Sequence, residues 1–265
     1  MLGCHMHISS KSLNHLDSYF KYYNVCQIFL GSPRTFQVPR IDYYSVPRNK
    51  NLIIHAPFVI SLVKDCSYHY TKSLKCLSEL SQQCYKMGAK YIVTHIGGID
   101  KEQSRPAMEV MYNFCMDWLE ATNNQDTILC LECSPGSKKG VAKGSLTFLY
   151  NFVSRLNHPR IKICWDTEHS WANGFDLNKK QSRFLLESGH VAVVHLNSIR
   201  VDIERGSHLD RHSDNLIQDG QKIEELKFIY SLADKLLIPC VLERDPSIVQ
   251  NDIDFLKKNK LKGVL

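Results

Sequence analysis

The sequence has no hydrophobic run long enough to cross a membrane and no low-complexity stretch between candidate domains. No segment approaches the ~18 apolar residues of a membrane-spanning helix. The first residues, Met1-Leu-Gly-Cys-His5, do not show the basic and then apolar pattern of a secretory signal. The nucleotide-binding pattern Gly-x-Gly-x-x-Gly and the phosphate-loop pattern are also absent after the apolar runs. We therefore expect an intracellular protein, cytoplasmic or nuclear and not secreted, that acts without a membrane.

The composition is that of an ordinary globular protein. The chain has 265 residues, of which 43% are hydrophobic and 23% charged. This length suits one α/β barrel of roughly 250 residues, so we expect a single domain over residues 1–265. The formal charge of +6 is a weak indication of an anionic partner such as nucleic acid.

The ten cysteines lie mostly inside apolar runs that resemble strands or helices. This distribution favours reduced, buried thiols over the disulfide framework of a secreted protein. The pair Cys130 and Cys133 could suggest a zinc knuckle. In a strand, however, positions 130 and 132 share one face and position 133 lies on the other, so the two sulfurs cannot easily bind one ion.

Short apolar runs alternate with segments of helical periodicity along the whole chain. The expected strands are residues 2–8, 25–30, 52–55, 91–95, 128–132, 161–166, 191–195 and 238–243. Apolar stripes at helical spacing lie between them, and the clearest of these stops at Gly88, where a left-handed cap would fit. Alternating units of this kind predict an α/β fold, a single (β/α)8 TIM barrel with its active site at the C-terminal ends of the strands.

Six of the expected strands end in a side chain that can bind a metal ion. These side chains are separated by 40, 37, 34, 29 and 48 positions, about one strand-plus-helix unit each. Three more candidate ligands lie in the loops that follow. The nine residues are His55, His95, Glu132, Asp166, His195 and Glu243 at the strand ends, and His169, Asp210 and His212 in the loops. Because the carboxyl ends of barrel strands meet at one face, we expect these side chains to converge.

Each of these residues has a simpler interpretation when taken alone. A single histidine or glutamate at a strand end is more often a packing residue or a salt-bridge partner than a ligand. Six strand ends in series would each need a separate explanation of that kind, so the joint pattern favours a metal site. Nine donors exceed the need of one or two ions but fit three ions that share one bridging carboxylate.

The donor types indicate the metal and the chemistry. Imidazoles and carboxylates without thiolate favour zinc or manganese. Three clustered dications suit hydrolysis of a phosphodiester, because they can activate water and neutralise charge on the phosphate. His5 and His7 are expected to line the same pocket.

Short strings spread along the chain resemble the endonuclease IV family in order and spacing. They are Gly3-x-His5, His55-Ala-Pro-Phe58, Thr94-His95, Leu131-Glu132, Asp166-Thr-x-His169, His195-Leu-Asn197, Asp210-Arg-His212 and Leu242-Glu243. The family consists of metal-dependent endonucleases that cut DNA at abasic sites. The resemblance implies a TIM barrel and a trinuclear zinc centre, with manganese as an alternative at one position.

The resemblance also implies a role for each ligand. His55 and His95 would hold the first ion, and Glu132 would bridge it to the second. Asp166, His195 and Glu243 would complete the second ion, and His169, Asp210 and His212 the third. The implied reaction is hydrolysis on the 5′ side of the abasic nucleotide, leaving a 3′-hydroxyl and a 5′-deoxyribose phosphate, with Glu132 and Glu243 as catalytic residues. Trimming of blocked 3′ ends is an implied secondary activity.

The resemblance places DNA contacts on the loops of an enzyme expected to be monomeric. Arg34 matches the position whose side chain enters the duplex, and Phe58 stands where the family usually has tyrosine, so stacking is kept and a phenolic hydrogen bond is lost. Further contacts to DNA are expected from Lys138, Lys139, Lys143 and Arg211. The sequence departs from the family after Glu132, where Cys133-Ser134 replaces the usual asparagine, and after His212. Neither departure removes a ligand.

Two other functions fit parts of the pattern. A sugar isomerase or epimerase would keep the barrel but needs one or two ions, and would leave Asp210-Arg-His212 without a purpose. A DNA-damage binding protein without catalytic activity would bind abasic DNA and not cut it.

Overall fold

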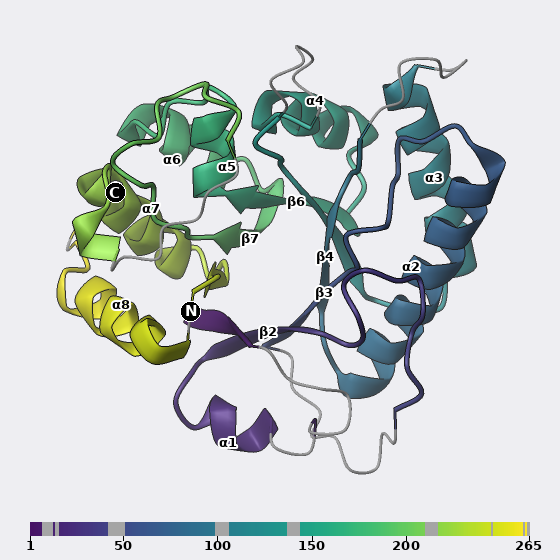
Figure 1. Ribbon diagram of the computed structural model, residues 1–265, viewed down its shortest axis with the longest axis horizontal. Helices are drawn as coiled ribbons and strands as arrows, with labels where there is room; N and C mark the ends of the chain where they lie inside the picture. Colours follow the sequence, from purple (N-terminus) through teal and green to yellow (C-terminus); the bar gives the residue numbers. More distant parts are fainter. Residues whose placement is uncertain are drawn as a thin grey trace.

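The computed structural model describes residues 1–6, 13, 16–41, 51–98, 106–136, 144–209, 217–244, 246–261 and 263. Eight parallel strands close into one barrel in the order β1 to β8 (Figure 1). Their bounds are β1 Leu2–Met6, β2 Val25–Phe29, β3 Leu52–His55, β4 Tyr91–His95, β5 Ile128–Glu132, β6 Ile161–Asp166, β7 Val191–His195 and β8 Cys240–Leu242. The prediction of a TIM barrel is confirmed.

Helices surround the barrel on its outside (Figure 1). They are α1 Leu16–Phe20, α2 Ser67–Met87, α3 Ala107–Ala121, α4 Leu146–Leu156, α5 Thr167–Ala172, α6 Lys179–Glu187, α7 Ile223–Lys235 and α8 Pro246–Lys258, with a short 3-10 turn at Ile217–Asp219. The apolar stripe of α2 faces the barrel, with Leu77, Leu80 and Met87 buried. As expected, α2 ends at Gly88, whose φ of 72° is in the left-handed region that favours glycine.

The alternation of strands and helices is less regular than the sequence predicts. Between β2 and β3 the described residues contain no helix, and residues 42–50 are not described. The segment after β6, expected to be a loop, instead forms the extra helix α5. Asp166 caps this helix, because its Oδ1 accepts a hydrogen bond of 2.7 Å from the backbone N–H of His169.

The inside of the barrel is divided into an apolar and a polar layer. Side chains from seven strands pack together in the apolar layer: Val25, Ile53, Val93, Cys130, Cys164, Val193 and Val241. In β1 the inward position is Gly3, where a Cβ atom would lie 1.7 Å from the carbonyl oxygen of Val25. Glycine is therefore required for β1 to approach β2. The polar layer, at the carboxyl ends of the strands, contains the candidate ligands.

The cysteines are distributed as the sequence predicts. All ten are free thiols, and all except Cys66 are buried. Cys130 faces the barrel interior, whereas Cys133 belongs to the core between barrel and helices. This arrangement excludes a zinc knuckle built from these two sulfurs.

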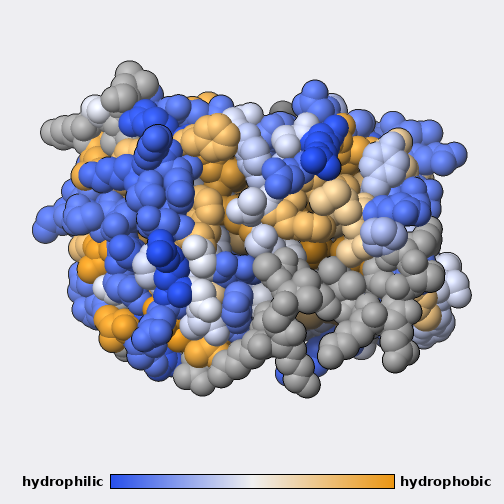
Figure 2. Space-filling model, turned by 90° about the horizontal axis from the view of Figure 1, so that it is seen from above, coloured by the Kyte–Doolittle hydropathy of each residue, from blue (hydrophilic) through white to orange (hydrophobic). Residues whose placement is uncertain are grey.

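On the face seen in Figure 2, hydrophilic side chains predominate, and hydrophobic side chains show near the middle and in smaller patches toward the lower left. None of the described helices has both the length and the apolar character needed to span a bilayer.

Candidate metal centre

The structure brings together the seven predicted ligands that lie within its described residues. His55, His95, Glu132, Asp166 and His195 end strands β3 to β7, Glu243 follows β8, and His169 lies in α5. Glu132, Asp166 and His195 are almost completely buried, whereas His95 and Glu243 are 24% and 17% exposed. Residues outside the described part of the chain include Asp210 and His212, together with the expected DNA contacts Lys138, Lys139, Lys143 and Arg211.

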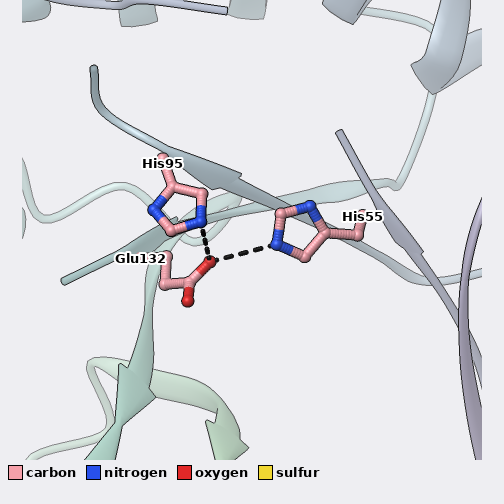
Figure 3. A group of neighbouring side chains, drawn as sticks. All are labelled: His55, His95 and Glu132. Atoms are coloured by element: carbon pink, nitrogen blue, oxygen red, sulfur yellow. Dashed lines mark hydrogen bonds and ion pairs between the residues drawn. The ribbon is translucent and has the colours of Figure 1, made fainter. Parts of the chain in front are cut away.

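Glu132 is the centre of the cluster. One carboxylate oxygen, Oε2, lies 3.2 Å from Nε2 of His55 and 3.3 Å from Nε2 of His95 (Figure 3). The other oxygen, Oε1, lies 3.2 Å from Nδ1 of His195. The two oxygens therefore face different sets of donors, which is the geometry of a bridging carboxylate.

The second set of donors is built around His195. Its Nδ1 lies 3.4 Å from Oε2 of Glu243 and 3.8 Å from Oδ2 of Asp166. Asn197 joins these two carboxylates, because its side-chain N–H group donates to Asp166 at 2.6 Å and to Glu243 at 3.1 Å. Its Oδ1 accepts the backbone N–H of Glu243 at 3.1 Å, which fixes the start of the loop after β8.

A third set of donors lies at the start of α5. Asp166, Glu168 and His169 each offer a ligand atom, and these atoms lie within 4.8 Å of one another. The Oε2 atom of the buried Glu168 is 4.0 Å from Nε2 of His169. Glu168 fills the unspecified position of the Asp166-Thr-x-His169 string, so the motif gave no signal for it.

Backbone carbonyls orient two of the histidines. Nδ1 of His55 lies 2.8 Å from the carbonyl oxygen of Ala56, and Nδ1 of His169 lies 3.0 Å from that of Cys133. A carbonyl only accepts, so in both rings Nδ1 carries the proton and Nε2 is left to bind a metal. Because Cys133 acts here through its backbone, the exchange of asparagine for cysteine at this position preserves the orientation of His169.

The buried charges shift one another's ionisation. Burial opposes the charge of Glu132, but His95 and His195 beside it hold the pKa of its carboxyl well below the usual range. Burial alone would lower the pKa of His195, but Glu243 and Glu132 outweigh it and raise that pKa to about 9. For His95 burial dominates over Glu132, and the pKa is lowered. The Glu132 carboxylate is therefore held in its charged form, which favours a cation beside it.

The donor set fits zinc in type and spacing. Ligands bonded 2.0–2.1 Å from a tetrahedral ion lie about 3.3 Å apart. The separations of Glu132 from His55, His95 and His195, 3.2 to 3.3 Å, have this size. The carboxylates of Glu132, Asp166 and Glu243 lie so close together that they repel one another unless positive charge lies between them. His55, His95 and Glu132 would hold one ion, and Glu132, Asp166, His195 and Glu243 a second.

Gln27 and Asn197 contact the ligands, and neither was assigned a role from the sequence. Gln27 is completely buried in β2 and its amide touches both His195 and Glu243. The signal in the sequence was a polar residue within an otherwise apolar strand. The predicted pocket residue His5 is 7% exposed, and Gln27 donates to its Nδ1 at 3.0 Å.

Two of the expected DNA contacts lie on neighbouring loops beside the cluster. Arg34 is exposed in the loop after β2, and Phe58 is 56% exposed in the loop after β3. The loops are joined, because the backbone N–H of Phe58 donates to the carbonyl of Pro33 at 2.8 Å. The Phe58 ring lies over the ligands, 5.6 Å between centroids from both His55 and His95.

The fold and the site together define a TIM barrel with a cluster of side chains that could hold metal ions at the carboxyl ends of its strands. Residues 40–259 match the model of the xylose isomerase-like TIM barrel family. The chain belongs to this family.

Relatives of known sequence support the resemblance to endonuclease IV. A protein named probable endonuclease 4 from Mycoplasmopsis synoviae is 29% identical, and the match covers 92% of each chain. Another of the same name, from Mycoplasmopsis agalactiae, is 27% identical over 99% of this chain and 100% of its own.

Solved structures show the same fold. Endonuclease IV from Thermus thermophilus superposes with a TM-score of 0.74 at 20% identity, covering 97% of this chain and 98% of its own. A D-tagatose 3-epimerase-like protein has a TM-score of 0.71 at 14% identity, with coverage of 97% and 96%. The resemblance to endonuclease IV that the motifs predict is confirmed.

Proposed function

We propose that the protein is an abasic-site endonuclease. It hydrolyses the phosphodiester on the 5′ side of an abasic nucleotide in double-stranded DNA, leaving a 3′-hydroxyl and a 5′-deoxyribose phosphate. Blocked 3′ ends are a second class of substrate at the same pocket. The names of the relatives support this activity, and so does the arrangement of the ligands.

The observation that carries the proposal is the position of Glu132. Its two oxygens face two different sets of donors, 3.2 Å from His55 on one side and 3.2 Å from His195 on the other. A carboxylate in this position would serve two ions at once. Paired metal ions are typical of phosphodiester hydrolysis, where both the attacking and the leaving oxygen need charge stabilisation.

The full proposed centre would contain three zinc ions. His169 would complete a third position with Asp210 and His212, which lie outside the described residues. When bound, the ions supply Lewis acidity for the attacking water and positive charge for the phosphate.

The protein's own residues orient the reactants. Glu243 is 17% exposed, compared with 1% for Glu132, and it is fixed by Asn197 and Gln27. We assign to its carboxylate the task of orienting the attacking water and accepting its proton. Glu132 keeps the donor sets on either side of it at a fixed separation.

The neighbouring loops would recognise the lesion. An abasic nucleotide is easier to extrude than an intact one because little stacking must be broken. Arg34 would enter the gap left in the duplex, and Phe58 would lie beside the extruded sugar, above the histidines of β3 and β4. The backbone hydrogen bond from Phe58 to Pro33 keeps the two loops that carry Arg34 and Phe58 next to each other.

An abasic-duplex nicking assay tests the proposal. The zinc-loaded protein should cut a labelled duplex at a single abasic site and leave the undamaged duplex intact. A chelator should abolish cutting, zinc should restore it, and a polymerase should extend the new end. If protein of verified zinc content binds the abasic duplex without cutting it, a binding protein is the correct assignment.

Metal analysis separates the nuclease from a sugar epimerase of the same fold. A content near three ions per chain favours the nuclease, whereas a single ion together with isomerisation of a ketose would favour the epimerase. The sharing of Glu132 between two donor sets argues for the first outcome.

A further inference from the structure

Gln27 makes contacts in the centre of the barrel that link three strands. Its side chain, completely buried in β2, reaches β1, β7 and the residue after β8. Oε1 lies 2.9 Å from Nε2 of His195, and the amide nitrogen lies 3.0 Å from Oε1 of Glu243 and 3.0 Å from Nδ1 of His5. The amide oxygen of Gln27 thus accepts from His195, and its two N–H donors are both satisfied, one by Glu243 and one by His5.

The negative charge of Glu243 fixes the orientation of this amide. An ionised carboxylate only accepts hydrogen bonds, so the NH2 group of Gln27 must face Glu243. The reverse orientation would place the amide oxygen against the carboxylate and would repel it. The amide oxygen therefore faces His195, whose Nε2 must carry the proton.

This orientation determines which nitrogen of His195 can bind a metal. With a proton held on Nε2, only Nδ1 is available to a metal ion, and this atom lies 3.2 to 3.8 Å from oxygens of Glu132, Glu243 and Asp166. His55 and His169 obtain the same kind of control from backbone carbonyls. Among these three rings, His195 alone relies on a side chain for it, so a substitution can remove the control.

We propose that Gln27 is the positioning residue of the second donor set, which fixes the tautomer of His195 and the rotation of Glu243 toward a bound cation. The inference rests on the proposed function in so far as the cluster binds zinc. It assigns Gln27 no contact with DNA.

The substitution Gln27→Met tests the assignment, because methionine has a similar length and no hydrogen-bonding amide. Loss of an outer partner of a ligating histidine typically costs 10–100-fold in metal affinity. We expect the zinc affinity of the second donor set to fall by about that factor. The affinity would be measured by competition with a chromogenic chelator. The visible absorption spectrum of the cobalt-loaded variant should also change.

Ile28→Val is the matched control. Ile28 is the next residue of β2, is buried on the opposite face, and contacts the core between barrel and helices. This change loosens the packing of the strand but should leave zinc affinity and the cobalt spectrum as in the wild type. In a DNA assay, Gln27→Met should lower kcat and leave KM within about twofold.

A measurement on the wild-type protein covers the case in which Gln27→Met fails to fold. Nitrogen-15 spectra of the zinc-loaded protein should show His195 with its proton on Nε2. A proton on Nδ1, or wild-type zinc affinity and an unchanged cobalt spectrum in a folded Gln27→Met, would overturn the assignment. Neither metal measurement requires DNA cleavage, so the result stands apart from the outcome of the nicking assay.

Discussion

Replacing Glu132 by glutamine should weaken two metal positions at once. The substitution keeps the shape of the side chain and removes its charge. A four-ligand structural zinc site is worth about 10–16 kcal/mol, so one ligand contributes roughly 3 kcal/mol, or about 100-fold in affinity. Because one oxygen of Glu132 faces His55 and the other faces His195, we expect a loss of roughly 10–100-fold at each position.

The assay is a zinc titration of the variant with a competing chelator, followed by abasic-duplex nicking at equal metal content. Circular dichroism should show the barrel still folded. Glu187→Gln is the matched control, since the same change at this exposed residue removes only a surface ion pair with Arg183. If Glu132→Gln retains both zinc affinities, or loses only one, the bridging role of this carboxylate is refuted.

The remaining predictions concern recognition, stability and thiol chemistry. Arg34→Ala should leave metal content unchanged and weaken binding to an abasic duplex by roughly 1–3 kcal/mol; equal affinity in a gel-shift titration would place recognition elsewhere. Asp252→Ala leaves the buried guanidinium of Arg244, 3.0 Å away, without this partner and should cost about 3–5 kcal/mol in urea unfolding; a loss smaller than about 1 kcal/mol would contradict the reasoning. A thiol reagent at pH 8 should modify Cys66 rapidly and the nine buried cysteines only after unfolding; several fast thiols in the native protein would be inconsistent with the structure. Stability should fall as the pH rises above ~8.5, by about 1.4 kcal/mol per pH unit for each buried thiol, because the unfolded chain releases these protons first, and an unfolding free energy equal at pH 8 and pH 10 would rule this out. Burial raises the pKa of four of these thiols to about 12: Cys4, Cys76, Cys115 and Cys240.

Much of the fold was predictable because its determinants are local. Apolar runs of four to seven residues coincide with the eight strands to within about two residues at either end. Helices α2 and α6 end just before Gly88 and Gly189, which have positive φ, as expected. The last strand is shorter than predicted, since only Cys240–Leu242 pairs with its neighbours. Pro239 has no backbone N–H to contribute to the sheet, which agrees with this later start.

The extra helix α5 could not be read from periodicity. It spans only six residues, Thr167–Ala172, all of them buried, so it has no amphipathic stripe. A local indication of this helix in the sequence is its capping residue, Asp166, which is also a candidate ligand. Both uses are compatible, because Oδ1 caps the helix and Oδ2 faces the cluster.

The positions of the candidate ligands were easier to predict than the residues that orient them. Most candidates have a side-chain type that is uncommon at the end of an apolar strand, and the position of a strand end follows from the barrel. The residues that orient them depend on contacts across the barrel. Gln27 and His195 are in contact although they are 168 positions apart in the sequence. Cys133 orients His169 through its backbone carbonyl, a group that every residue has.

A zinc anomalous-difference map from crystals of the metal-loaded protein tests the central claim most directly. We predict separate peaks within coordination distance of the two oxygens of Glu132, one shared with His55 and His95 and the other with His195 and Glu243, and a third beside His169. A single peak, or a Glu132 carboxylate that contacts no ion, would contradict the proposed metal centre.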